Sequence, residues 1–264
     1  QWAAWGVDYL KYDWNPIELP ETLEMYRALR HSGRDIIFSL SNDMNITNAP
    51  TIGKIANSWR TTGDIKASWW SMTANGLAQA RWVKYSSPGH WNDPDMLEIA
   101  TKERGQTGLT PDEEYLHMTL WCLLASPLLL GNDLTHMDAF TLNLLENDEV
   151  LAVDQDELGK QAEPISTYGN PVKISRAGRD GSTQTREIIP LQIWARPLAD
   201  GSKAVGLFNF GDAKTNVTVK WPDLKISGTH AVRDLWRQKN LGEFKNEFSM
   251  PVAPHSAELV KISP

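Results

Sequence analysis

The chain has 264 residues, of which 41% are hydrophobic and 22% are charged, and its formal net charge is -7. This composition is typical of a globular protein with a substantial core. The acidic balance argues against a nucleic-acid partner, which favours a basic stripe, and without a run of 18 apolar residues no membrane span is predicted. Cys122 is the single cysteine, so the sequence excludes an internal disulfide and a thiolate metal cluster.

The first half of the chain alternates between short apolar runs and segments with helical spacing. Residues 1–6 resemble the last turn of a helix that ends at Gly6. Strands are expected at residues 6–14, 35–42, 58–65, 88–97 and 127–133, and helices at 20–30, 48–57, 68–84, 110–125 and 141–147. Repeated strand–helix units at about 30-residue spacing predict parallel strands with crossover helices.

Polar residues gather at the carboxyl end of each expected strand, where a (β/α)8 barrel builds its active site. A doubly wound sheet would do the same, but no glycine-rich phosphate loop follows any strand. We count five strand units before residue 155, whereas a closed barrel needs eight. Residues 1–157 are therefore predicted to be the C-terminal part of a (β/α)8 catalytic barrel, with about three units missing from its N-terminus.

The second part of the chain, residues 158–264, loses helical periodicity. Short β-rich runs separated by turn residues predict an antiparallel β-sandwich domain, with strands at 191–195, 203–210, 215–221, 229–235 and 256–262. Residues 168–187, rich in Gly, Arg and Ser, are predicted to form a long exposed hairpin or insertion.

Three acids stand at the ends of expected strands: Asp13, Asp64 and Asp95. Side chains alternate along a strand, so Lys11 shares a face with Asp13 and would favour its ionised form. Such a pair suits a nucleophile or a structural ion pair equally well. Paired carboxylates carry out glycoside hydrolysis. Residues 92–95 could instead form a metal loop, but no partner stands at a recognised ligand spacing, so neither a metal nor a cofactor is expected.

Five motifs and a C-terminal dipeptide resemble glycoside hydrolase family 27, the α-galactosidase family of clan D. They lie, in the family's order, at residues 6–13, 58–65, 88–97, 129–133, 149–156 and 254–255. The resemblance implies a retaining enzyme that removes terminal α-linked galactose by double displacement.

By the same resemblance, Asp13 corresponds to the nucleophile and Asp64 to the general acid/base. Lys11 and Arg60 correspond to residues that bind the galactose hydroxyls, and Arg60 is expected to contact substrate more than Asp64. Asp95 corresponds to an acid near the 2-hydroxyl, with Met96 beside it in the pocket.

The chain also departs from the family pattern. It has Ser41-Asn42-Asp43 where many relatives have Cys-Glu-Trp, and Asn42 would read the C2 group of the sugar. Trp14 replaces a small residue, His90 stands where Gly is common, and the aromatic and Asp pair that bind the 4- and 6-hydroxyls belong to the absent strands.

Two alternatives stay open: the same chemistry on an α-N-acetylgalactosaminide or a β-L-arabinopyranoside, and a non-catalytic carbohydrate-binding protein. The expected partner is a small-molecule or oligosaccharide α-galactoside, with neither nucleic acid nor membrane. A homo-oligomer is possible, and the resemblance favours a periplasmic or extracellular location.

Overall fold

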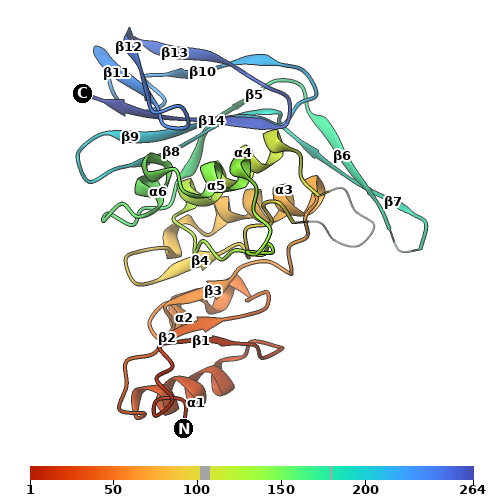
Figure 1. Ribbon diagram of the computed structural model, residues 1–264, viewed down its shortest axis with the longest axis vertical. Helices are drawn as coiled ribbons and strands as arrows, with labels where there is room; N and C mark the ends of the chain where they lie inside the picture. Colours follow the sequence, from red (N-terminus) through yellow and green to blue (C-terminus); the bar gives the residue numbers. More distant parts are fainter. Residues whose placement is uncertain (102–107, 179) are drawn as a thin grey trace.

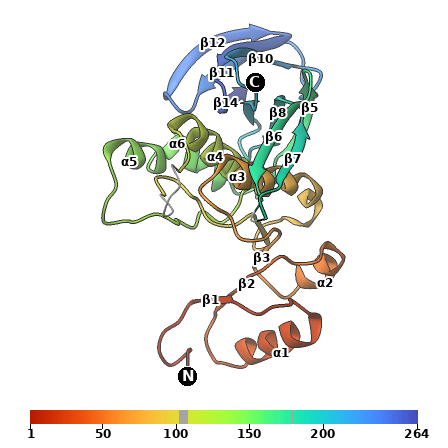
Figure 2. The same ribbon diagram turned by 90° about the vertical axis from the view of Figure 1, so that its right-hand side faces the viewer.

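A computed structural model describes residues 1–101, 108–178 and 180–264. The chain forms an N-terminal α/β part and a C-terminal β part, which lie at opposite ends of an elongated molecule (Figures 1 and 2). None of the helices in the described ranges is long and apolar enough to cross a bilayer.

The α/β part is built on a parallel four-stranded sheet with the order β1-β2-β3-β4. Its strands are β1 (Tyr9–Tyr12), β2 (Ile37–Leu40), β3 (Ser58–Arg60) and β4 (Trp91–Asp93). The α-helices are α1 (Leu19–Arg30), α2 (Ala49–Ile52), α3 (Trp69–Leu77), α4 (Pro111–Leu124), α5 (Ala139–Leu145) and α6 (Asp148–Asp154), and three 3-10 turns lie at Ile46–Asn48, Ala78–Arg81 and Val83–Tyr85. Neighbouring strands are parallel and in sequence order, as the strand–helix alternation predicted.

The helix predicted from the Thr-Pro-x-Glu pattern is α4, and both halves of its capping box form. The Thr110 hydroxyl accepts from Glu113 N, and the Glu113 carboxylate accepts from Thr110 N at 2.7 Å. These two bonds satisfy donors that the first helical turn would otherwise leave free. Helix α4 then runs through the middle of the molecule, with nearly all of its side chains buried.

The strand expected at residues 127–133 is reduced to a single parallel bridge between Leu97 and Leu130. Only two hydrogen bonds form it, from Leu97 N to Leu129 O and from Gly131 N to Leu97 O. The reason lies in β4, which ends at Asp93 because the following Pro94 has no N–H to donate and Asp95 turns the chain. Four strands and one bridge therefore stand where the sequence predicted five strands.

The C-terminal part is a β-sandwich of antiparallel strands. A six-stranded sheet has the order β12-β11-β14-β9-β8-β5, and the pair β10-β13 covers one of its faces. The bounds are β5 (Glu163–Tyr168), β6 (Val172–Ala177), β7 (Thr183–Ile188), β8 (Leu191–Pro197), β9 (Lys203–Asn209), β10 (Thr215–Lys220), β11 (Thr229–Asp234), β12 (Lys239–Lys245), β13 (Glu247–Val252) and β14 (Ser256–Ser263). Strands β6 and β7 form the predicted exposed hairpin.

All five β runs read from the sequence are strands, whereas β5, β12 and β13 were not predicted. The missed strands contain Pro164, Gly242 and Pro251, and they lie at the edges of their sheets. Edge strands tolerate proline, glycine and charge because one side needs no ladder hydrogen bonds. Their sequences therefore carry little of the alternating apolar signal.

Both faces of the six-stranded sheet are buried, and alternate residues of β9 show how. Val205 and Leu207 belong to the core against β10 and β13, whereas Ala204 and Phe208 belong to the core around α4. Gly206 also faces α4, and a Cβ added there would lie 2.5 Å from Leu123 Cδ1. This close contact fixes the sandwich against the α/β part.

Candidate active site

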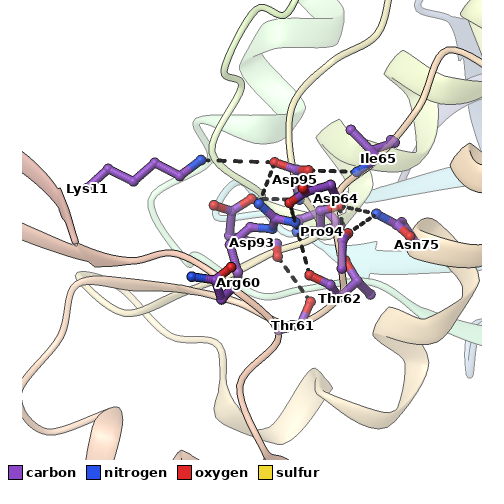
Figure 3. Close-up of polar contacts among 12 residues, drawn as sticks. Lys11, Arg60, Thr61, Thr62, Asp64, Ile65, Asn75, Asp93, Pro94 and Asp95 are labelled. Carbon is purple, nitrogen blue, oxygen red and sulfur yellow. Dashed lines mark hydrogen bonds and ion pairs between the residues drawn. The ribbon is translucent and has the colours of Figure 1, made fainter. Parts of the chain in front are cut away.

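Four neighbouring strands end close together, and their carboxyl ends carry the predicted site residues. In β1 to β4 the residues Lys11, Ser39, Ser58 and Trp91 lie at one level of the sheet, joined by direct register partners. One level further along come Asp13, Arg60 and Asp93. Figure 3 shows Lys11, Arg60, Asp64 and Asp95 around one point at this end of the sheet.

Asp95 is the centre of this cluster. Its side chain is only 3% exposed, and every oxygen has a partner: Oδ1 lies 2.9 Å from Arg60 Nη1 and 4.0 Å from Lys11 Nζ, and Oδ2 accepts from Ile65 N at 2.8 Å. A buried carboxylate is tolerated only when it is paired and hydrogen-bonded in this way. Asp95 therefore links β1, β3 and the loop that follows Asp64.

Arg60 joins two of the predicted acids. It is 2% exposed and lies at the end of β3. Besides the pair with Asp95, its Nη2 donates to Thr62 O at 3.0 Å and to Asp64 Oδ1 at 3.3 Å. Arg60 thus contacts Asp64 as well as Asp95, and its preference for substrate over Asp64 stays a prediction. The short loop 61–63 brings the Asp64 carboxylate back over the guanidinium.

Asp64 itself is open to solvent, with 87% of its side chain exposed. The loop that carries it is nevertheless fixed, because Asn75 Nδ2 in α3 donates to both Gly63 O and Pro94 O at 3.1 Å. Sequence reasoning missed Asn75, since an amide inside a helix gives no signal of its partner. An exposed acid on a fixed loop can exchange protons with solvent and with a bound molecule.

Asp13 follows β1 and is also exposed. Its partner is Asn42, which follows β2 and whose Nδ2 donates to Asp13 Oδ1 at 2.9 Å and to Trp14 O at 3.0 Å. The sequence predicted that Lys11 would accompany Asp13, but Lys11 forms its ion pair with Asp95 instead. The flexible lysine reaches the buried acid, which needs a cation more than an exposed acid does.

Asp93 was considered in sequence only as part of a metal loop, and here it shapes the turn. Its Oδ1 accepts from Asp95 N at 2.8 Å, an Asx turn that holds Asp95 at a positive φ of 86°. Burial raises the pKa of Asp93 to about 6, although the Asp95 N–H, Lys11 and Arg60 oppose this shift. The Asp-Pro-Asp sequence was the signal for this turn.

Met96 is partly buried and packs against the core around α4, one residue beyond Asp95. Asn92, the remaining polar residue of residues 92–95, serves the core: its Oδ1 accepts from the Trp59 indole and its Nδ2 donates to Trp82 O. Within the described ranges, no group of three His, Cys, Asp or Glu side chains could hold a metal ion.

Comparisons with known proteins agree with a carbohydrate-active class for this strand-end cluster of acids. A family described as "Alpha galactosidase A" matches residues 1–156, and "Alpha galactosidase C-terminal beta sandwich domain" matches residues 189–262. Alpha-galactosidase 2 of Arabidopsis thaliana is 39% identical over 267 residues, which cover 99% of this chain and 61% of that protein. Alpha-galactosidase of Oryza sativa is 35% identical, covering 99% of this chain and 58% of that protein.

Solved structures agree. Alpha-galactosidase I from Mortierella vinacea superposes with a TM-score of 0.85 at 30% identity, covering 99% of this chain and 69% of that one. A β-L-arabinopyranosidase of family 27 from Geobacillus stearothermophilus gives a TM-score of 0.85 at 29% identity, covering 100% of this chain and 59% of that one.

The fold is thus that of a glycosidase, a partial (β/α)8 barrel followed by a β-sandwich. The chain belongs to glycoside hydrolase family 27, the α-galactosidase family. It spans about three fifths of the length of the first two curated relatives.

Proposed function

We propose that this chain carries the two catalytic acids of a retaining α-galactosidase. Asp13 is the nucleophile and Asp64 the general acid/base, while Lys11, Arg60, Asp95 and Met96 bind the sugar and Asn42 lies beside its C2 group. The α-galactosidases that are 35–39% identical over nearly the whole chain support this activity. The substrate is a terminal α-galactoside, either small or part of an oligosaccharide.

The reaction takes two displacements at the anomeric carbon. In the first, an Asp13 oxygen bonds to this carbon, the glycosidic C–O bond breaks, and the Asp64 proton passes to the leaving oxygen. In the second, Asp64 removes a proton from water, the water oxygen bonds to the anomeric carbon, and the Asp13 carboxylate leaves. Two inversions give net retention.

One observation carries the proposal: a single buried guanidinium, that of Arg60, binds both Asp64 and the buried Asp95. The acid/base is thereby oriented by the group that also fixes the sugar-binding acid. Asn42 does the same for Asp13 through its amide donor. Fixed orientation of reacting groups is a major source of rate acceleration.

The test uses the full-length protein and an unactivated α-galactoside. Asp13→Asn and Asp64→Asn should each reduce turnover by at least about a thousandfold, since the nucleophile or the proton donor is lost. Asp43→Asn, a nearby exposed acid outside the cluster, is the control. Turnover close to wild type in either catalytic variant would contradict the assignment, and galactose binding without hydrolysis by the wild type would favour a carbohydrate-binding protein.

The sugar preference is tested separately with α-galactoside, α-N-acetylgalactosaminide and β-L-arabinopyranoside. We expect the highest kcat/KM for the α-galactoside. Asn42→Glu should change the ratios among the three substrates if residue 42 reads C2, and unchanged ratios would remove that role from Asn42. A preference of the wild type for either other sugar would keep the chemistry and correct the substrate.

A further inference from the structure

A polar cavity of about 900 Å³ lies between the β6–β7 hairpin and the start of α3. Its walls are formed on one side by the segment that follows Asp64 and on the other by the hairpin. Its lining includes the charged side chains of Lys66, Arg176 and Asp180, together with the polar side chains of Ser68, Ser71, Ser175 and Gln184. The cavity lies outside the acid cluster around Asp95.

The hairpin lies outside both matched family segments. It occupies part of the interval between residues 156 and 189, which neither family description covers. Figure 1 shows it projecting from the sandwich and reaching the side of the molecule on which α3 begins. It therefore adds a wall next to the α/β part that the two matched segments do not supply.

Arg186 anchors this hairpin. Its guanidinium lies 4.8 Å from the Trp70 ring centroid, and its Nη2 donates to Trp70 O at 2.9 Å and to the Thr73 hydroxyl. Burial lowers the pKa of Arg186 to about 10, so the anchor stays charged at neutral pH. The hairpin is thus fixed against α3 and forms one wall of the cavity.

Arg176 and Lys66 are the binding groups that the cavity offers. Both are exposed, and neither forms an ion pair within 4.0 Å in the described part of the chain. Arg176 lies 5.0 Å from the Trp70 ring centroid, and its Nε donates to Gln184 Oε1, which leaves its terminal nitrogens available. Arg176, Gln184 and the anchor Arg186 share one face of the hairpin, the face turned to α3.

The cavity's position relative to Asp64 indicates what it could bind. Lys66 is two residues from Asp64, so their Cα atoms are at most about 7 Å apart. The general acid of a retaining glycosidase protonates the leaving oxygen, so the leaving part of the substrate lies on the side of that acid. A pyranose ring attached to galactose would extend from Asp64 toward this cavity.

We propose that the cavity between the β6–β7 hairpin and α3 binds the leaving-group sugars of an α-galactosyl oligosaccharide, with Lys66 and Arg176 donating hydrogen bonds to their hydroxyls. This inference rests on the proposed function and adds to it a binding site for the leaving-group sugars. Hydroxyl-rich rings suit a wall of amine, guanidinium, amide and serine groups, because each sugar hydroxyl both donates and accepts.

The test compares two substrates of the full-length protein: an aryl α-galactoside, whose leaving group has no sugar, and an α-galactosyl tetrasaccharide. Lys66→Ala and Arg176→Ala should each lower kcat/KM for the tetrasaccharide about tenfold, the effect of losing one charge-assisted hydrogen bond. The aryl substrate should change less than twofold. Lys173→Ala is the matched control, because Lys173 lies on the opposite face of the same hairpin, 4.0 Å from Glu187.

The outcomes separate the two proposals. A wild type that hydrolyses neither substrate contradicts the proposed function and this inference with it. A wild type that hydrolyses both substrates, with Lys66→Ala and Arg176→Ala leaving both kcat/KM values unchanged, contradicts the binding site alone. Because the aryl substrate reports folding and catalysis in the same samples, a misfolded variant is recognised by equal losses, and Arg176→Lys then repeats the test with the charge retained.

Discussion

The two sheets of this molecule are stabilised by different interactions. The six-stranded antiparallel sheet buries apolar side chains on both faces, one against β10 and β13 and the other against α4. The four-stranded parallel sheet instead ends in a row of charged side chains, of which Asp93, Asp95 and Arg60 are almost completely buried. The first sheet is held by hydrophobic burial, which depends on shape. The second is held at its carboxyl end by ion pairs, which depend on every partner being present.

This difference shows why the candidate site lies where it does. Burying charged groups costs free energy of folding. The cluster of Lys11, Arg60 and Asp95 offsets this cost with a function, because it orients neighbouring groups of the candidate site. Asp13 and Asp64 are exposed, yet each is oriented by a fixed neighbour. The sandwich also holds two buried acids, Asp234 and Glu258, but their shared partner Arg237 has 57% of its side chain exposed.

Removing Arg60 should have the largest effect on stability. Arg60→Met would leave the Asp95 carboxylate buried without its principal cation, which should lower the free energy of unfolding by about 3–5 kcal/mol. Arg30→Met is the matched control, since Arg30 pairs at 3.8 Å with the fully exposed Asp35 and its loss should be barely measurable. Urea unfolding of both variants checks this. Equal losses would show that the site cluster is no more dependent on its partners than a surface pair.

Asp93→Asn should change how stability depends on pH. Burial raises the folded-state pKa of Asp93 from 3.8 to about 6. The native state therefore holds its proton between these values while the unfolded chain has lost it, so the stabilisation present below pH 4 is lost as pH rises through 6. The amount is on the order of 3 kcal/mol.

The measurement is urea unfolding of wild type and variant at several pH values from 4 to 7. The wild type should lose stability through both Asp93 and Asp154 as pH rises, since burial raises the pKa of Asp154 to about 7. The Asn variant should keep the Asp154 contribution and lack the one from Asp93. Parallel stability curves for wild type and variant would show that Asp93 does not titrate in this range.

Gly206→Ala probes the other sheet and should have a smaller effect. The added Cβ would lie 2.5 Å from Leu123 Cδ1 and from Phe208 Cε2, so side chains between the sheet and α4 must shift. Overpacking of this kind should cost about 1–3 kcal/mol. Gly63→Ala in the α/β part is the control, because nothing lies within 4 Å of its added Cβ. Thermal unfolding would contradict the close packing at Gly206 if the two variants were equally stable.

The sequence predicted well what depends on local pattern. The capping box at Thr110 and the β-rich run that forms β9 are encoded within each element, and the parallel strands β1 to β4 follow from the repeated strand–helix units. It failed where the outcome depends on distant partners. Lys11 was assigned to Asp13, its neighbour along β1, because sequence reasoning sees spacing and not the acid that the fold buries 84 residues later.

The missed strands and the missing fifth strand have the same explanation. Strand β12 has little apolar alternation because it lies at the edge of its sheet. Residues 127–133 are apolar, but the neighbouring segment after β4 is a turn, so only the bridge between Leu97 and Leu130 forms. In both cases the neighbouring segment, and not the sequence of the strand itself, decides whether a ladder forms.

The most direct test of the central claim is to trap the covalent intermediate on Asp13. The full-length protein is incubated with a slowly turned-over fluorinated galactosyl donor, and its peptides are analysed by mass spectrometry. A retaining mechanism with Asp13 as nucleophile predicts one fluorogalactosyl group on the peptide that contains Asp13, and none in Asp13→Asn. A label on another carboxylate, or turnover of the donor with inverted product and no labelled peptide, would contradict it.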